Sequence, residues 1–243
     1  MNAIFEPSPL GRILVPGQVP AGYALFYTTS DFDGHLKHGA AAKLTDLVRD
    51  RFGIEVALST CTQVHGARVA RAEGGAAWQE CDSCDALYTD QPRRALAIKV
   101  ADCLPVTLID AAHGVMANIH SGWRGSVQRI TAVTLDTLER ETAFAPAHAR
   151  AWLGPSIRVC CFEVGEEVVE QFRAAYADAD TFIDRTLGPK PHIDTAGLTR
   201  ALLAERGITD VVDVALCTRC GPDFHSYRRT PAGGGRNLAV VAH

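Results

Sequence analysis

Residues 95–125 read ALAIKVADCLPVTLIDAAHGVMANIHSGWRG. Short apolar runs recur within this stretch, at Ala95–Val100, Val106–Ile109 and Val115–Ile119. Runs of this length, bounded by turn-forming residues, predict buried strands. The polar, glycine-containing turn after the third run leads into Val127–Glu141, where apolar residues recur every three or four positions as on one face of a helix. The stretch therefore predicts closely spaced strands followed by a helix.

Similar segments continue on both sides of this stretch. Further strands are predicted at Ala24–Thr28, Glu55–Ser59, Ala67–Arg71, Val211–Leu216 and Leu238–Val241. Further helices are predicted at Ala40–Phe52, Glu166–Tyr176 and Thr195–Arg206, the last with Asp194 as its N-cap. Because strands and helices mix over one continuous pattern without a linker or a repeat, we expect a single α/β or α+β domain over residues 1–243.

Composition and charge exclude several classes of protein. The chain has 243 residues, of which 47% are hydrophobic and 21% charged, and its formal net charge is −4. A mildly acidic chain is a poor general nucleic-acid binder, because that function needs a basic face. No apolar stretch approaches the roughly 20 residues of a membrane span. Met1–Gly17 lacks the basic and apolar regions of a secretion signal, so we expect a cytoplasmic protein.

Reactive side chains gather where the predicted strands end. His65 lies in the segment Thr62–Gly66, Cys103 follows the first run of the opening stretch, and His120 follows the third. Two imidazoles and one thiolate can hold a zinc ion with one position open, which would polarise a substrate or activate a water molecule. The same residues also fit a metal-free thiolate nucleophile with a histidine base and Asp102 as an orienting neighbour. Spacing alone does not separate these two chemistries.

Basic residues near these clusters indicate an anion site. Arg124 lies at the predicted start of a helix, where free backbone N–H groups also favour a phosphate or a carboxylate. A second basic cluster near the C-terminus either faces the same cleft or lies on a surface loop. It comprises Arg219, Tyr227, Arg228, Arg229 and Arg236. Arg158 and Glu163, in the dense segment Gly154–Gly165, are secondary candidates.

Eight cysteines in a chain without an export signal are more typical of buried, metal-binding or catalytic thiols than of disulfides. Cys81/Cys84 and Cys217/Cys220 have C-x-x-C spacing, which raises the hypothesis of a four-cysteine zinc site. More than a hundred residues separate the two pairs, so we favour buried or bystander thiols. We interpret the adjacent Cys160–Cys161 as packing residues, because neighbouring side chains on a strand point in opposite directions.

Two motifs are specific enough to indicate a family. Ala-Asp-Cys-Leu-Pro at 101–105 and His-Ser-Gly-Trp-Arg-Gly at 120–125, together with residues 62–66, 154–165, 226–229 and 235–239, resemble the laccase-domain or polyphenol oxidase family. That family is also described as purine nucleoside phosphorylases and, in some bacteria, as a peptidoglycan editing factor. The resemblance implies a sandwich of mixed β-sheets layered against flanking helices (αββα). It also implies that His65, Cys103 and His120 are the zinc-binding catalytic residues.

The resemblance implies cleavage of adenosine, inosine or methylthioadenosine by phosphate, and deamination of adenosine. A purine nucleoside and phosphate are thus the expected small-molecule partners, and Zn²⁺ is the expected cofactor. The residues that we expect to bind substrate or phosphate are Arg124, Arg228 and Asp102. Copper (Cu²⁺) and phenol oxidation are attached to the family in older descriptions, but nine histidines without a His-x-His pair suit them poorly. A Cys-His amide hydrolase in peptidoglycan editing and a non-catalytic binding module remain alternatives. Where family members usually carry Thr-Arg-x-Gly-Gly-Val-Ser, this chain has the divergent segment Thr28–Leu36, so substrate preference is open, as is the oligomeric state.

Overall fold

The computed structural model describes residues 3–35, 40–74, 77–231 and 234–243. Leu36, at the end of the divergent N-terminal segment, lies outside these ranges. The strands are β1 (Ala3–Ser8), β2 (Gly11–Pro16), β3 (Ala24–Thr28), β4 (Ala57–Cys61), β5 (Val69–Arg71), β6 (Trp78–Cys81), β7 (Ala86–Thr89), β8 (Arg94–Val100), β9 (Leu104–Asp110), β10 (Val115–Ser121), β11 (Arg150–Leu153), β12 (Ile183–Asp184), β13 (His192–Ile193), β14 (Val211–Asp213) and β15 (Asn237–Ala242). The helices are α1 (Ala40–Phe52), α2 (Trp123–Val127), α3 (Ile130–Glu141), α4 (Glu166–Ala175) and α5 (Thr195–Glu205), with 3₁₀ turns η1 (Pro146–His148) and η2 (Ala179–Phe182).

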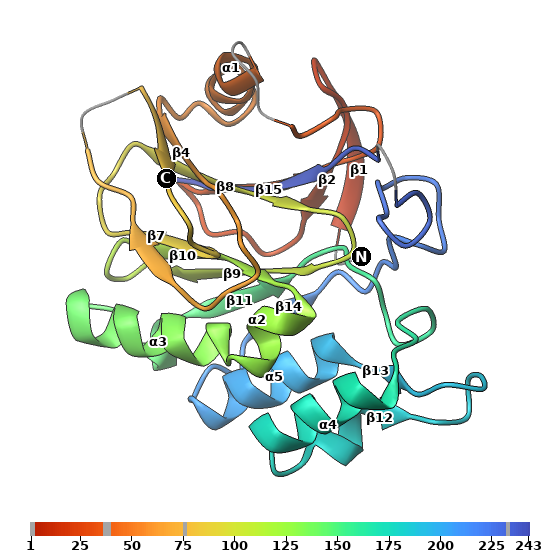
Figure 1. Ribbon diagram of the computed structural model, residues 1–243. Coiled ribbons are helices and arrows are strands. Elements are labelled where there is room, and N and C mark those ends of the chain that lie inside the picture. Colours follow the sequence, from red (N-terminus) through yellow and green to blue (C-terminus); the bar gives the residue numbers. More distant parts are fainter. Residues whose placement is uncertain (1–2, 36–39, 75–76, 232–233) are drawn as a thin grey trace.

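Two mixed sheets stack face to face, and helices cover their outer faces (Figure 1). The seven-stranded sheet has the order β1-β2-β3-β15-β8-β4-β6, and the six-stranded sheet has the order β14-β11-β9-β10-β7-β5. Helix α1 packs on the outer face of the first sheet, while α3, α4 and α5 lie below the second (Figure 1). The mixed α/β class and the αββα layering that the sequence predicted are confirmed.

The core has three parts that correspond to these layers. Between the two sheets, Leu96 and Ile98 of β8 pack with Met116 of β10 and Trp152 of β11. A second cluster fills the space between the six-stranded sheet and helices α3, α4 and α5, and a third lies beneath α1. Every residue of β9 and β10 is buried, because both faces of these strands are covered. The predominance of apolar residues in both strands thus reflects burial on both sides, and the polar Thr107 and Asn118 within them share a buried hydrogen bond.

The helix predicted over Val127–Glu141 is two helices. The helical segment begins earlier than expected, with α2 at Trp123. The helix is interrupted at Arg129, whose φ of 59° is left-handed. A left-handed residue interrupts the backbone hydrogen bonding of a helix, and α3 starts directly after it. The Asp194 N-cap of α5 is confirmed, because its side chain accepts a hydrogen bond from the backbone N–H of Gly197 at 2.9 Å.

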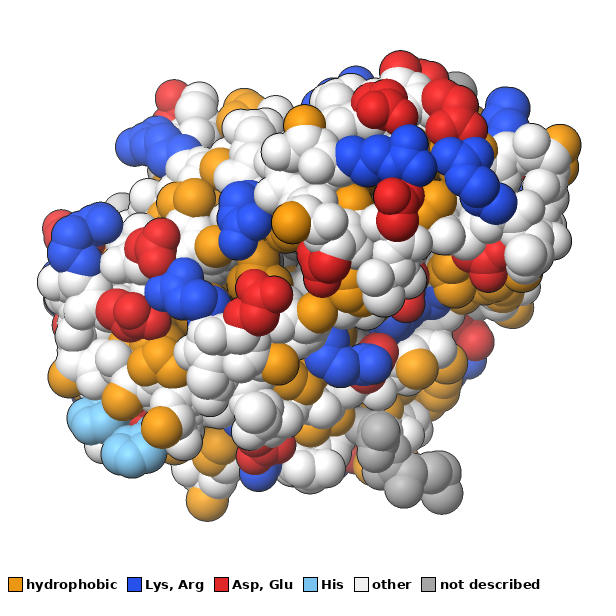
Figure 2. All heavy atoms as spheres, turned by 90° about the horizontal axis from the view of Figure 1, so that it is seen from below, with side chains coloured by type: hydrophobic (Ala, Val, Ile, Leu, Met, Phe, Trp, Pro, Cys, Tyr) orange, Lys and Arg blue, Asp and Glu red, His pale blue; other side chains and the backbone are white. Residues whose placement is uncertain are grey.

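The face formed by α3, α4 and α5 carries interspersed charges of both signs (Figure 2). Ion pairs join Arg185 to Glu166, Arg173 to Asp180, and Arg206 to acidic residues of α3. Water and salt screen pairs this exposed, so they contribute little to stability and the layers are held mainly by the apolar core. Within the described residues, no helix combines the length and the apolarity that crossing a membrane requires.

Candidate active site

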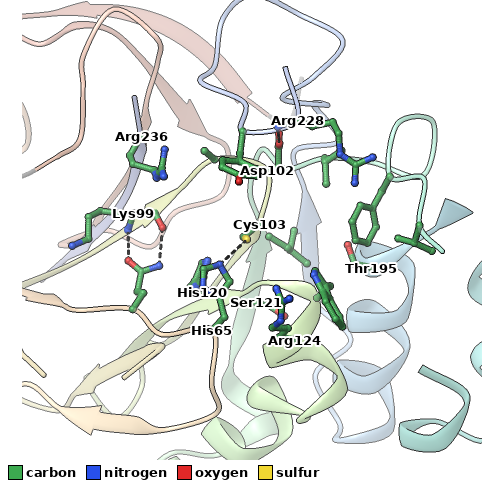
Figure 3. Close-up of a pocket in the computed structure, with 18 of the residues that line it drawn as sticks. His65, Lys99, Asp102, Cys103, His120, Ser121, Arg124, Thr195, Arg228 and Arg236 are labelled. Atoms are coloured by element: carbon green, nitrogen blue, oxygen red, sulfur yellow. Dashed lines mark hydrogen bonds between the residues drawn. The ribbon is translucent and has the colours of Figure 1, made fainter. Parts of the chain in front are cut away.

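Three strand ends bring the predicted reactive side chains together. β4 and β8 are parallel neighbours, so residues 62–66 and residues 101–103 leave the same edge of the seven-stranded sheet. The chain then crosses to the second sheet, where β9 runs antiparallel to β10 and pairs His120 with the residue two positions beyond Cys103. This crossing places Cys103 beside both His65 and His120 (Figure 3).

The three side chains fit a tetrahedral zinc ion. Cys103 Sγ lies 3.9 Å from Nε2 of His65, and the three potential ligand atoms all lie within 4.8 Å of one another. Zinc bonds of about 2.3 Å to sulfur and about 2.05 Å to nitrogen, at a tetrahedral angle, separate the two ligand atoms by about 3.6 Å. The separation of Cys103 Sγ and His65 Nε2 is within a few tenths of an ångström of this value, and three ligands would leave the fourth position of the ion open. We call His65, Cys103 and His120 the N₂S triad.

Asp85 holds two members of the N₂S triad in place. Its buried carboxylate accepts hydrogen bonds from Nδ1 of His120 at 2.8 Å and from the backbone N–H groups of Val64, His65 and Gly66. Because a carboxylate only accepts, the His120 proton sits on Nδ1 and Nε2 is left to bind a metal. The same carboxylate anchors the left-handed backbone of His65, whose φ is 60°. Burial works against the Asp85 charge, but these donors outweigh it and hold the pKa of Asp85 below its usual value.

The N₂S triad is also electrostatically coupled. Burial disfavours the Cys103 thiolate, yet the neighbouring imidazoles, chiefly His120, lower the pKa of Cys103 to about 6. Burial likewise disfavours the His120 imidazolium, yet Cys103 and Asp85 raise the pKa of His120 to about 9. Without a metal, the pair therefore exists at neutral pH as thiolate and imidazolium. With a metal, the thiolate is already in the form that coordinates.

A cavity of about 820 Å³ opens beside the N₂S triad. This volume lies in the range of small-molecule sites, about 300–1,000 Å³. Four cationic side chains surround the cavity, and Figure 3 shows them on different sides of it: Lys99, Arg124, Arg228 and Arg236. The acidic residues of the lining are Asp102, whose carboxylate is bonded within the protein, and Glu163, which pairs with Lys190 at 3.4 Å. The cavity is thus positive in an acidic chain, which favours an anionic ligand.

Arg124, Arg228 and Asp102 all line this cavity, but the two arginines are exposed and Asp102 is buried. Arg124 is exposed and its guanidinium lies 4.4 Å from the ring centre of Trp123. The helix it belongs to has only five residues, so the guanidinium rather than a helix dipole supplies the charge. Arg228 is exposed and donates to the backbone oxygen of Glu163 at 3.0 Å.

Asp102 is buried, and both its carboxylate oxygens are already bonded within the protein. They accept from Thr218 Oγ1 at 2.6 Å, Ser226 Oγ at 3.0 Å and the Arg228 backbone N–H at 2.6 Å. Its backbone oxygen accepts from the Ile157 N–H at 2.8 Å, and its φ of 84° is left-handed. Asp102 thus joins three loops around the cavity and fixes the backbone next to Cys103, rather than offering a free oxygen to a ligand.

Several lining residues were not singled out from the sequence. Lys99 is the only charged residue of β8 beyond its first position, and a lysine in an otherwise apolar strand is a signal that could have found it. Its backbone exchanges two hydrogen bonds with the side chain of Gln63, which ties the strand to the His65 loop. Trp123 and Phe162 add aromatic surface. Of the C-terminal basic cluster, Tyr227, Arg228 and Arg236 face the cavity, whereas Arg219 and Arg229 do not line it.

One cysteine expectation agrees with the structure and another needs correction. Within the described residues the two C-x-x-C pairs do not share a site, because Cys217 and Cys220 lie with Cys160 and Cys161. The reading of Cys160–Cys161 as packing residues was wrong, because the segment is a turn in which both backbone N–H groups of Cys161 and Phe162 bond back to the Arg158 oxygen. In a turn, unlike a strand, successive side chains can face the same side, and these two sulfurs lie 3.8 Å apart.

The described residues do not supply the ligands of a multi-copper centre. Besides the cysteine cluster, the groups of potential ligands there are the N₂S triad and Asp110 with His113 and His148, each containing two histidines. Adjacent copper ions would need many more imidazoles around one point. The N₂S triad suits one ion, and a single Cu²⁺ can compete for it because copper tops the affinity series.

Comparison with known proteins gives consistent results. A family model described as multi-copper polyphenol oxidoreductase laccase matches residues 37–243. A purine nucleoside phosphorylase of Deinococcus radiodurans is 38% identical over 179 residues, which cover 74% of this chain and 67% of the relative. The adenosine deaminase RL5 of an unknown prokaryotic organism is 36% identical over 164 residues, covering 66% of this chain and 62% of the relative. The chain thus spans about two thirds or somewhat less of these relatives' own length.

Solved structures of similar proteins share the fold over nearly the whole chain. YlmD of Geobacillus stearothermophilus superposes with a TM-score of 0.84 at 24% identity and covers 99% of both chains. The Neisseria meningitidis protein NMB0706 superposes with a TM-score of 0.76 at 26% identity and covers 100% of this chain and 99% of that one. The family model, the relatives and the resemblance of the sequence motifs agree. The chain therefore belongs to the multi-copper polyphenol oxidoreductase laccase family.

Proposed function

We propose that the protein is a zinc-dependent purine nucleoside phosphorylase that also deaminates adenosine. The observation that carries this proposal is the N₂S triad at the edge of a cavity surrounded by four cationic side chains. Relatives named purine nucleoside phosphorylase and adenosine deaminase support the same substrate class. The bound nucleoside and phosphate are the small-molecule partners that such a cavity would take.

The cations are suited to hold phosphate, and the aromatic residues to hold the purine. Arg124 and Arg228 have exposed guanidinium groups with donors free for a bidentate contact to phosphate oxygens. Trp123, Phe162 and Tyr227 offer apolar faces to the planar base. In phosphorolysis, a phosphate oxygen attacks C1′ as the bond from C1′ to the purine nitrogen breaks. The electron pair leaves with the base, which then takes up a proton, and ribose 1-phosphate remains.

His65, Cys103 and His120 would hold Zn²⁺, which when bound supplies a Lewis acid at the cavity wall. Asp85 and Asp102 act by positioning the residues of the site. Asp85 fixes the tautomer of His120 and the backbone of His65 through four hydrogen bonds. Asp102 fixes the backbone that carries Cys103 and, through its bond to the Arg228 N–H, the loop that brings Arg228 to the cavity. In deamination, the same cavity would admit water in place of phosphate, and ammonia would leave from C6 of the purine.

The purified protein should be incubated with adenosine, with and without phosphate, and the products separated by chromatography. We expect adenine and ribose 1-phosphate only with phosphate, and inosine under both conditions. Arg228→Gln should raise the KM for phosphate by about 10- to 150-fold, because a charge-assisted hydrogen bond contributes about 1.5–3 kcal/mol. The matched control is Arg140→Gln, which removes an exposed arginine that pairs with Glu141 on α3. If no adenine, hypoxanthine or inosine forms at high enzyme concentration, the proposal is wrong.

One observation favours a second candidate, a thiol hydrolase acting on an amide. Cys103, His120 and Asp85 form a nucleophile, base and orienting-carboxylate series, in which the pKa of Cys103 is lowered to about 6. A thiolate would attack an amide carbon, and the His120 imidazolium would protonate the departing amine; water would then hydrolyse the thioester to a carboxylate and restore the Cys103 thiol. Chelation separates the two candidates, because a strong chelator should abolish the zinc enzyme and leave a thiol hydrolase active. Cys103→Ser should inactivate both.

A further inference from the structure

A second cluster of potential ligands lies outside the N₂S triad. β11 and β14 are parallel neighbours, so the loops that follow them start at the same end of the six-stranded sheet (Figure 1). A bridge between Ser156 and Cys217 keeps the two loops in register, with the Thr218 N–H donating to the Ser156 oxygen at 3.0 Å. The first loop continues to Cys160 and Cys161, and the second carries the C-x-x-C pair. The four sulfurs meet between the loops, and all lie within 4.8 Å of one another. We call this group the four-cysteine cluster.

The separations among the sulfurs of Cys160, Cys161 and Cys220 match those around one tetrahedral ion. Cys160 Sγ lies 3.8 Å from Cys161 Sγ and 3.6 Å from Cys220 Sγ, and Cys161 Sγ lies 3.4 Å from Cys220 Sγ. Four zinc–sulfur bonds of about 2.3 Å at tetrahedral angles place the sulfurs about 3.8 Å apart. A disulfide needs about 2.05 Å, and all four cysteines are free thiols in this structure. The geometry is therefore that of a ligand set for one ion rather than of two crosslinks.

Donors and positive charge surround the sulfurs. The backbone N–H groups of Arg158, Arg219 and Cys220 lie near the Cys217 sulfur and favour its thiolate. The Arg219 guanidinium donates to Cys161 Sγ at 3.7 Å and, within the described residues, forms no ion pair with a carboxylate. Four thiolates around a divalent ion carry a net charge of about −2. Amide donors and an arginine without an acidic partner are the outer-shell groups that such a centre requires.

We propose that Cys160, Cys161, Cys217 and Cys220 form a structural zinc site that crosslinks the loops after β11 and β14. Four soft thiolates in tetrahedral array select zinc or iron, and a closed set of four protein ligands is typical of structural zinc. The ion would hold the loops together next to Asp102, which already receives hydrogen bonds from Ile157 and Thr218 of these same loops. It would thereby fix one wall of the cavity without contacting a substrate.

The proposal is tested on full-length protein in which the N₂S triad is disabled by His65→Ala/Cys103→Ser, so the result does not depend on the proposed activity. After expression with Zn²⁺ and gel filtration, we expect about one zinc per chain by elemental analysis. X-ray absorption at the zinc edge should show a shell of four sulfurs at about 2.3 Å. Adding Cys217→Ser/Cys220→Ser should remove this zinc and lower the melting temperature. The matched control Cys81→Ser, a half-buried cysteine of the other C-x-x-C pair, should leave the zinc in place.

A separate variant guards against loss of folding. Cys160→Ser changes an exposed cysteine and leaves three sulfurs, so the protein should fold but release zinc to a chromophoric chelator more than about tenfold faster. Absence of zinc from the His65→Ala/Cys103→Ser protein would overturn the proposal. The proposal would also be overturned by iron bound in place of zinc, or by a coordination shell dominated by nitrogen or oxygen. A disulfide, seen as a mass lower by two hydrogens per cysteine pair, or unchanged zinc release in Cys160→Ser would overturn it as well.

Discussion

Asp85→Asn is the substitution that probes the candidate site most selectively, because it changes no proposed metal ligand. The side chain keeps its shape, but one carboxylate oxygen becomes an NH₂ group. In the unmodified protein, four donors face the Asp85 carboxylate: Nδ1 of His120 and the backbone N–H groups of Val64, His65 and Gly66, at 2.7–3.2 Å. An asparagine there can accept through one oxygen only, and its NH₂ group must face at least one of the donors.

The magnitude follows from burial. Asp85 is fully buried, and removing one partner of a buried charged interaction costs about 3–5 kcal/mol. Since asparagine preserves the volume and one acceptor, we expect the low end, about 3 kcal/mol. For a chain of this size, about 2–4 °C per kcal/mol corresponds to a melting temperature lower by about 6–12 °C. Loss of an outer-shell carboxylate should also weaken zinc binding by about 10–100-fold.

The assays are calorimetry of the zinc-free protein and competition for Zn²⁺ with a chromophoric chelator. Asp90→Asn is the matched control, because Asp90 accepts two hydrogen bonds from Arg71 but is 28% exposed and lies outside the N₂S triad. Its cost should stay within about 1 kcal/mol, with zinc affinity unchanged. If Asp85→Asn binds zinc within threefold of the unmodified protein and melts no lower than Asp90→Asn, the role assigned to Asp85 is refuted.

Two further predictions concern the N₂S triad itself. In zinc-free protein, alkylation of Cys103 by iodoacetamide should rise with pH through a midpoint near 6, since the lowered pKa means that the thiolate persists until the pH falls below that value. His120→Asn should move the midpoint toward about 8.5 and slow the reaction at pH 7 about 30-fold, measured by mass spectrometry of the Cys103 peptide; an unchanged midpoint would contradict the coupling. Gly122→Ala adds a Cβ only 3.0 Å from Cys103 Sγ and from His65 Cδ2, so zinc affinity should fall, whereas the control Gly188→Ala lies on an exposed loop and should have no effect. Equal zinc affinities for the two glycine variants would contradict the geometry of the triad.

The sequence was sufficient to predict much of the fold and the clustering of the N₂S triad, because the strands that lead to these residues are easy to recognise. Strands β8, β9 and β10 are almost entirely buried, so they are rich in apolar residues, with few polar interruptions such as Lys99, Thr107 and Asn118, and are easy to find. The strands β1 and β2 were missed because Pro7 and Pro16 argue against strands, yet this hairpin forms the edge of a sheet, where proline is tolerated. The break at Arg129 was missed because an arginine gives no local signal for a left-handed backbone.

The sequence did not single out Asp85, and it named Asp102 as a neighbour of Cys103 without revealing its partners, because both roles depend on contacts between distant segments. Asp85 meets His120 across 35 positions, and Asp102 meets Ser226 across 124. The pairing of the C-x-x-C segment with Cys160–Cys161 likewise depends on the adjacency of β11 and β14, which periodicity does not reveal. Motifs at strand ends thus located the reactive groups, while the groups that orient them required the tertiary structure.

The most direct measurement is anomalous scattering at the zinc absorption edge from a crystal grown without added metal. We expect a peak about 2.3 Å from Cys103 Sγ and about 2.0–2.1 Å from one ring nitrogen each of His65 and His120. A peak that appears only at the copper edge, or side chains that hold no metal after the protein is loaded with Zn²⁺, would contradict the assignment of these three residues as a zinc centre.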